Sequence, residues 1–179
     1  GGIDAKDEET GTTILAAAVE SGDIDVVSAV LDAGARVNAR DRNGKTALMH
    51  ARDVRIAKLL IDKKADVNAR DCGGQTPLMF APDADITKLL VENDADVNAR
   101  SGLENTALML ARSVASARVL LENNADANAK DHLGRTPLML AENVAMARLL
   151  IEYKADVDAR DDEGWTTLMH ARNADITRL

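Results

Sequence analysis

The sequence predicts an all-α solenoid in which helix–turn–helix units stack on one another. The main observation is a repeat: the segment Asp41–Arg70 returns with small changes as 71–100, and again from Ser101, Asp131 and Asp161. Self-similarity at a fixed period near thirty residues is typical of a stacked solenoid. The composition agrees, because only 2% of the residues are aromatic. The core must therefore be built from aliphatic side chains and Met, which favours thin helical layers.

Each unit contains its elements in the same order. In the unit 41–70, the turn DRNG precedes a short helix that begins near Thr46 (TALMHA), and a second helix follows over VRIAKLLIDK. Ile56, Leu59 and Leu60 in this second helix are spaced to share one face. The segment ADVNAR then runs extended into the next turn. Isolated helices shorter than ~12 residues are marginal in water, so we expect neighbouring units to stack and to stabilise the first helix.

We expect the whole chain to form a single repeat array. The boundaries of its units are about 8–40, 41–70, 71–100, 101–130 and 131–160, with a partial unit at 161–179.

The repeated motifs resemble those of the ankyrin repeat family, whose unit is a helix–turn–helix joined to the next by a hairpin-like loop. The resemblance covers nearly the whole chain, from about residue 8 to the end, and the opening unit, 11–40, has the family's full spacing with both of its glycines, Gly22 and Gly34. The motifs that recur in later units are GQTPLM at 74–79, GRTPLM at 134–139, and ADVNAR at 65–70 and 95–100. We therefore expect an ankyrin-like solenoid.

Three features depart from the family pattern, and the first is length. The later units are three residues shorter than the usual 33, and the shortening falls between the two helices. The residues that stand at this junction are all good helix N-caps: Asp53, Asp83, Ser113, Asn143 and Asn173. A side-chain cap of this kind contributes ~1 kcal/mol, so we expect each of them to cap the second helix of its unit.

The second departure is that Met stands where the family motif has His. The family's imidazole usually bridges neighbouring loops by hydrogen bonds, which a thioether does not do. We interpret these Met side chains as adaptable core filler between stacked helices rather than as metal or cofactor ligands. The positions are Met49, Met79, Met109, Met139 and Met169.

The third departure concerns the Gly that closes the second helix, which survives only as Gly34. Either the residues that replace it keep a positive φ at some cost in strain, least for Asn, or the loop follows a different path. The replacing residues are Lys64, Asp94, Asn124 and Lys154.

The composition excludes several classes of ligand. The net charge is −8, which argues against nucleic acid because binding to a phosphate backbone needs an excess of Lys and Arg. No apolar run approaches the ~20 residues that span a bilayer, so we expect no membrane partner. The chain does not begin with Met, so we expect an N-terminus that is processed or truncated. The compartment is cytoplasmic by default, with a periplasmic or secreted location left open.

No residue set in the sequence predicts catalysis. The three His residues, His50, His132 and His170, are spread over different units, and Cys72 is the only Cys, with its reactivity left open. A zinc site would need several Cys or His ligands within about 2.3 Å of the ion. There is no phosphate-binding loop and no Ser with a His in its own unit to act as a base. We therefore expect no cofactor and no metal, and we predict that the protein is not an enzyme.

Residues that vary between units are the candidates for binding, because the repeated ones build the framework. The resemblance implies a protein partner that contacts the loop tips and first helices. Aromatic residues are the ones that most often dominate interfaces. The predicted partner-binding residues are Leu103, His132, Leu133, Trp165, Phe80, Tyr153, Arg42, Lys45 and Arg135.

One loop tip, Ser101–Asn105, departs from the others because Glu104 replaces the turn Gly. Either its turn is locally altered, or the tip is shaped for a partner. The function that we predict is a monomeric, non-catalytic module that binds another protein, and in a sharper form binds an enzyme and blocks its active site. The alternative is a targeting or regulatory segment of a larger protein, and an enzyme is the third and weakest reading.

Overall fold

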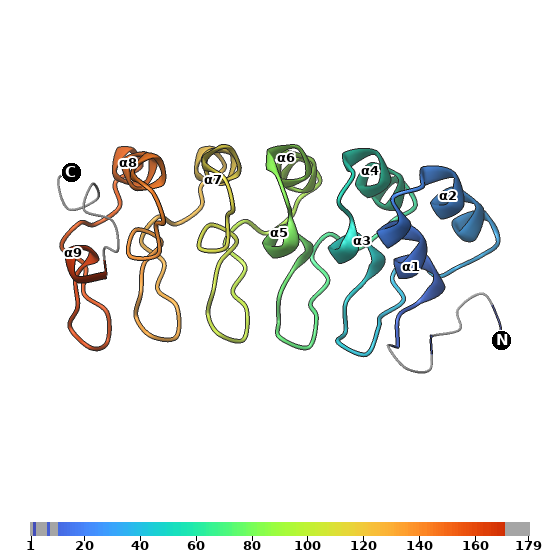
Figure 1. Cartoon of the computed structure of the whole chain (residues 1–179), viewed down its shortest axis with the longest axis horizontal. Helices are drawn as coiled ribbons and strands as arrows, with labels where there is room; N and C mark the ends of the chain where they lie inside the picture. Colours follow the sequence, from blue (N-terminus) through green and yellow to red (C-terminus); the bar gives the residue numbers. More distant parts are fainter. Residues whose placement is uncertain (1, 3–6, 8–10, 171–179) are drawn as a thin grey trace. The chain divides into compact units, whose positions relative to one another are not determined.

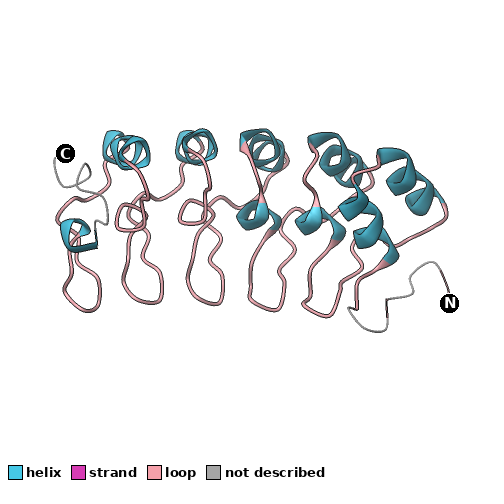
Figure 2. Ribbon diagram, in the orientation of Figure 1, coloured by secondary structure: helices cyan, strands magenta, loops and turns pink. Residues whose placement is uncertain are grey.

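The computed structural model describes residues 2, 7 and 11–170. Over this part of the chain the regular elements are helices, and the described residues contain no β-strand (Figures 1 and 2). An isolated antiparallel bridge joins Arg160 and Thr166. The prediction of an all-α helical repeat fold is confirmed. None of the described helices is long and apolar enough to cross a membrane.

The chain folds as two compact units, residues 1–96 and 97–179. In the first unit, the helices α2, α4 and α6 pack side by side, and the helices α1, α3 and α5 form a second row from which the loops extend (Figure 1). The bounds of these helices are Ile14–Ser21 for α1, Ile24–Asp32 for α2, Ala47–His50 for α3, Val54–Asp62 for α4, Pro77–Phe80 for α5 and Ala84–Glu92 for α6.

The second unit contains α7 (Val114–Glu122), which packs against α8 (Val144–Glu152), and the short helix α9 (Thr167–His170). The predicted first helices of the units 101–130 and 131–160 are wrong as helices, because residues 107–110 and 137–140 form turns instead. Their backbone hydrogen bonds, such as Leu110 N–H to Ala107 O at 3.2 Å, span three residues rather than four. The hydrogen bonds of a tighter turn therefore replace the α-helical ones in these two units.

The predicted caps at the shortened junction are confirmed wherever the junction is described. The side chain of Asp53 accepts from Arg55 N–H at 2.7 Å and caps α4. Three further caps follow the same pattern on α6, α7 and α8: Asp83, Ser113 and Asn143. The fifth predicted cap, Asn173, lies outside the described residues. At the shortened turn, the N-cap side chain thus stabilises the start of the second helix.

The loops after the second helices keep the path that Gly34 takes in the first unit. Gly34 has a φ of 95°, and the four residues at the matching positions also have a positive φ. Their values are 71° for Lys64, 65° for Asp94, 65° for Asn124 and 63° for Lys154. The alternative in which the replacing residues keep a positive φ is therefore confirmed. The left-handed residue lets the next N–H turn back onto the helix, as Ala65 N–H does to Leu60 O at 2.9 Å.

Side chains of Asn connect each loop to the next. The Asn68 amide donates to Asp94 O at 2.9 Å and accepts from Asp96 N–H at 2.8 Å. Because one amide group both donates and accepts, it holds the next loop at two adjacent points. The same paired contacts are made by Asn38 in the first compact unit and by Asn98 and Asn128 in the second.

The interpretation of the Met residues as core filler is confirmed for most of them. Met49, Met79 and Met139 are buried, and Met109 is half-buried. For Met169 the prediction of a core position is wrong, because 60% of its surface is exposed. The other four positions lie between neighbouring repeats, whereas within the described chain no later repeat packs over Met169.

Candidate protein-binding surface

At each loop tip, the side chain at the start of the turn bonds to the backbone of the turn. Asp131 is buried, and its carboxylate accepts from the N–H groups of Leu133 and Arg135, both at 2.9 Å. Asp41, Asp71 and Asp161 hold the tips of their own units in the same way. With these backbone N–H groups bonded inside the turn, a tip side chain such as that of Leu133 can remain exposed without disturbing the turn.

The irregular tip keeps the same turn in spite of its sequence. Glu104 has a φ of 60°, and its N–H donates to Ser101 O at 2.9 Å, as Gly134 N–H does to Asp131 O at 2.9 Å. The first alternative, a locally altered turn, is therefore wrong. What changes is the side-chain contacts: Glu104 forms an ion pair with Arg100, and the Ser101 hydroxyl accepts more weakly, at 3.3 and 3.2 Å.

Neighbouring tips in the second unit are joined through their backbones. Leu103 O accepts from His132 N–H at 3.1 Å, and the His132 ring nitrogen Nδ1 lies 3.1 Å from the same oxygen. Leu133 O accepts from Asp162 N–H at 3.1 Å. The tips that carry Leu103 and Leu133 are therefore direct neighbours, and 55% and 46% of the surfaces of these two leucines are exposed.

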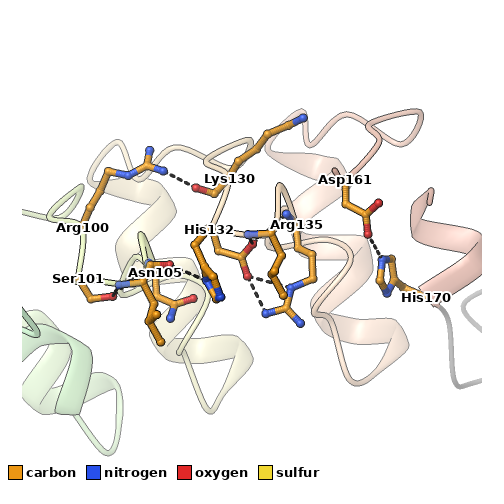
Figure 3. Close-up of polar contacts among 11 residues, drawn as sticks. Arg100, Ser101, Asn105, Lys130, His132, Arg135, Asp161 and His170 are labelled. Carbon is orange, nitrogen blue, oxygen red and sulfur yellow. Dashed lines mark hydrogen bonds and ion pairs between the residues drawn. The ribbon is translucent and has the colours of Figure 1, made fainter. Parts of the chain in front are cut away.

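Trp165 lies on the last described tip with 47% of its surface exposed. Its ring is tilted against that of His170, with 5.5 Å between the centroids. His170 Nε2 lies 2.7 Å from the Asp161 carboxylate at the base of the turn (Figure 3). Burial raises the pKa of Asp161, but hydrogen bonds from His170 and from the turn N–H groups lower it further, so the net pKa lies below its ordinary value. The carboxylate that orders this tip thus stays ionised.

Some of the predicted charged residues near the tips already make contacts within the protein. The Arg135 guanidinium is half-buried and bonded to its own Asp131, at 2.9 Å from Nε and 2.7 Å from Nη2. Burial raises the pKa of Asp131, but the hydrogen bonds from Arg135 and the turn N–H groups bring it below its ordinary value. In the first unit, Lys45 Nζ lies 4.3 Å from the centre of the Phe80 ring, a cation–π contact. Arg135 and Lys45 are therefore already engaged within the protein.

The structure brings some of the predicted residues together and separates others. Lys45 pairs with Phe80 in the first unit, and Leu103, His132 and Leu133 lie together in the second. The exposed predicted residues are Arg42, Leu103, His132, Leu133 and Trp165, and the half-buried ones are Lys45, Phe80, Arg135 and Tyr153. Tyr153 lies at the end of α8, away from any tip turn. Within the described residues, no group of three His, Cys, Asp or Glu side chains is placed to hold a metal ion.

Comparison with known proteins gives the family. A model of ankyrin repeats, built from three copies, matches residues 1–71, 52–131 and 108–179. The chain belongs to the ankyrin repeat family. Among solved structures, it is similar to the ankyrin repeat domain of Bcl-3, described as a unique member of the IkappaB protein family. The two are 28% identical with a TM-score of 0.79, and the match covers 99% of this chain and 86% of that one.

Ankyrin repeats are protein–protein interaction modules, and the fold is a non-catalytic one. This makes the outward-facing side chains of the ankyrin tips the first candidates for contact with a partner. The exposed apolar side chains on neighbouring tips of the second unit are the strongest of these candidates. Removing apolar surface from water drives association, so a partner that covers them would gain binding energy.

Two sets of connecting residues in this ankyrin array were missed from the sequence. The first is the Asn set described above, for which the recurrence of ADVNAR was a usable signal. The second is His50, whose Nδ1 lies 2.8 Å from Glu20 in the preceding repeat and whose Nε2 lies 3.5 Å from Asp41. A pattern within a single repeat does not predict this pairing. Glu20 lies thirty residues before His50, in the opening repeat, which alone has the full family length.

Proposed function

We propose that this chain is a non-catalytic, monomeric module that binds one protein partner through the loop tips of residues 97–170. The observation that carries the proposal is the pair of exposed leucines, Leu103 and Leu133, on tips that are hydrogen-bonded to each other. Each lies on a turn whose backbone is already satisfied, so its position is fixed before binding. Little ordering is then needed when a partner covers it.

Trp165 extends the apolar surface of the second unit, and Trp is among the residues that dominate interfaces. The net charge of −8 disfavours a phosphate backbone, which supports a protein over a nucleic acid as the partner. In the sharper form of the proposal the partner is an enzyme, and the rigid tips cover its active site.

The test is capture of partners from the source cells by the purified protein, with mass spectrometry, followed by affinity measurement with the partner that is recovered. Leu133→Asp and Trp165→Ala are the test variants. Val157→Asp is the matched control, because Val157 is 50% exposed in the same unit but does not lie on a tip turn. Far-UV circular dichroism shows whether each variant is folded.

We expect a single stoichiometric protein whose affinity falls about 10- to 100-fold with Leu133→Asp, as expected for losing one buried leucine contact, and is unchanged by Val157→Asp. Equal capture by wild type and both tip variants would refute the proposed surface. If the partner is an enzyme, saturating amounts of the wild-type protein should abolish its activity and Leu133→Asp should not.

A further inference from the structure

A cavity of about 320 Å³ lies in the second unit, at the junction between first-helix segments and second helices rather than at the tips. Two consecutive repeats contribute to it through the turns 108–112 and 137–143 and the start of α8. Buried side chains of Leu108, Pro137 and Leu150 lie among the lining residues. The half-buried apolar side chains that line it are Met109, Leu110, Leu140 and Met146.

The first unit shows how the same junction is closed elsewhere. There, Arg52 reaches from one repeat to the next and donates to Phe80 O at 3.1 Å. Arg112 stands at the matching place of the second unit, sixty residues on, and Leu140 matches Phe80. Arg112 makes no hydrogen bond or ion pair with any residue that the structure describes. Its guanidinium is exposed and lines the cavity instead of tying the two repeats together.

The charges that line the cavity are unpaired and of opposite sign. Glu142 is also exposed and also has no ion pair within the described chain. Arg112 favours a carboxylate, for which the planar guanidinium fork is well matched. Glu142 disfavours a second carboxylate and favours a cation. Together with the apolar side chains among the lining residues, these charges define the chemistry of a ligand.

We propose that this cavity is a second recognition site, which takes one large apolar side chain of a protein segment that carries an acidic residue beside it for Arg112. A basic residue on the other side of the apolar one faces Glu142. The inference rests on the proposed function, because it assigns to the same protein partner, or to one of its segments, a contact apart from the tips. Methionine side chains suit such a site because they adapt to the shape of the group that they contact.

The experiment selects a displayed library of random short peptides on the whole protein and measures the affinities of the enriched peptides by fluorescence anisotropy. Leu140→His is the first test variant, because His50 and His170 occupy the matching place in other repeats, which shows that the fold accommodates an imidazole there. Arg112→Glu is the second test variant. Because Arg112 is exposed, we expect this substitution to leave the fold intact. Leu133→Asp is the control at the tips.

We expect the enriched peptides to share a large apolar residue next to Asp or Glu. Leu140→His should weaken their binding about tenfold or more, the effect of losing most of one apolar contact. Arg112→Glu should weaken it as well, and selection on this variant should replace the acidic residue by Lys or Arg. Leu133→Asp should leave these affinities unchanged.

Enrichment without the paired apolar and acidic residues, or no enrichment at all, would overturn the proposal. Affinities that are lowered by Leu133→Asp alone would also overturn it, while leaving the tips as the binding surface. If the tip variants capture the partner as well as the wild type does but the cavity variants lower peptide affinity, the cavity stands and the proposed tip surface falls. Binding of the free amino acids leucine or methionine, with no peptide preference, would overturn it in favour of a small zwitterionic ligand.

Discussion

Lys64 ends the turn after α4 with a φ of 71°, in the left-handed region where a β-carbon crowds the following carbonyl group. Its side chain is exposed, and no ion pair joins it to another described residue. Asn38 contacts Lys64 through the backbone carbonyl alone, at 3.1 Å. A change to Gly therefore relieves backbone strain without removing a side-chain contact, and we expect Lys64→Gly to raise the free energy of unfolding.

The magnitude follows from two opposing effects. A residue with a β-carbon in the left-handed conformation costs roughly 1–2 kcal/mol relative to its preferred conformation. Glycine gains about 0.5–1 kcal/mol of conformational freedom in the unfolded chain, which opposes the gain. Taking the middle of each range, the net stabilisation by Lys64→Gly is about 0.8 kcal/mol.

The matched reciprocal variant is Gly34→Ala, at the one unit that kept the glycine. A β-carbon built on Gly34 meets no atom within 4 Å, so its effect is confined to the backbone with its φ of 95°. We expect a loss of about 1 kcal/mol. Lys64→Asn should lie between Lys64→Gly and the wild type, because Asn tolerates the left-handed region better than Lys.

Urea denaturation followed by far-UV circular dichroism measures these changes through the midpoint. The comparison is valid if the slope of the transition is the same for each variant, since a changed slope in a repeat array signals that the parts no longer unfold together. An unchanged or lowered midpoint for Lys64→Gly, beside a lowered midpoint for Gly34→Ala, would show that the left-handed residue is not strained in the way argued here.

Three further predictions concern the connections within the repeats. Asn68→Ala removes two hydrogen bonds between successive loops and should lower the free energy of unfolding by about 1–3 kcal/mol in urea denaturation, and a loss below 0.3 kcal/mol would contradict this role. The buried hydroxyl of Thr76 has no hydrogen-bond partner among the described residues, so Thr76→Val should raise the thermal midpoint, whereas Thr13→Val should lower it because Thr13 caps Ala16 N–H at 3.1 Å. Hydrogen bonds from the Arg55 side chain and backbone lower the pKa of Asp53 from 3.8 to about 2, so its contribution to stability is present above pH 3.8 and is lost as the pH falls through about 2. Thermal unfolding between pH 7 and pH 2 should therefore find Asp53→Asn less stable than the wild type at pH 7, with a difference that shrinks as the pH falls from 3.8 towards 2. A difference that does not depend on pH would contradict the ion pair.

Local features of the fold followed directly from residue types. The caps at Asp53, Asp83, Ser113 and Asn143 could be predicted because a capping side chain bonds to N–H groups two or three residues further along the same chain. The first-helix segments 107–110 and 137–140 could not be separated from α3 and α5, because nearly the same residues form an α-helical turn in one unit and a tighter turn in the other.

The candidate site divides in a similar way. Exposure of Leu103, Leu133 and Trp165 follows from their place on turns that the repeat itself marks. That Lys45 and Arg135 are engaged by Phe80 and Asp131 could not be predicted, because it depends on side-chain directions after stacking.

By itself, the sequence determined that this protein is an array of ankyrin repeats, since the period and the local turn and cap chemistry operate within about thirty residues of chain. Only the tertiary structure decided which side chains link one repeat to the next, which loops keep a left-handed residue in place of glycine, and where a cavity opens. The physical reason is that these features depend on contacts between repeats. Residues in the same register of two units, such as Arg52 and Arg112, meet different neighbours once the units are packed.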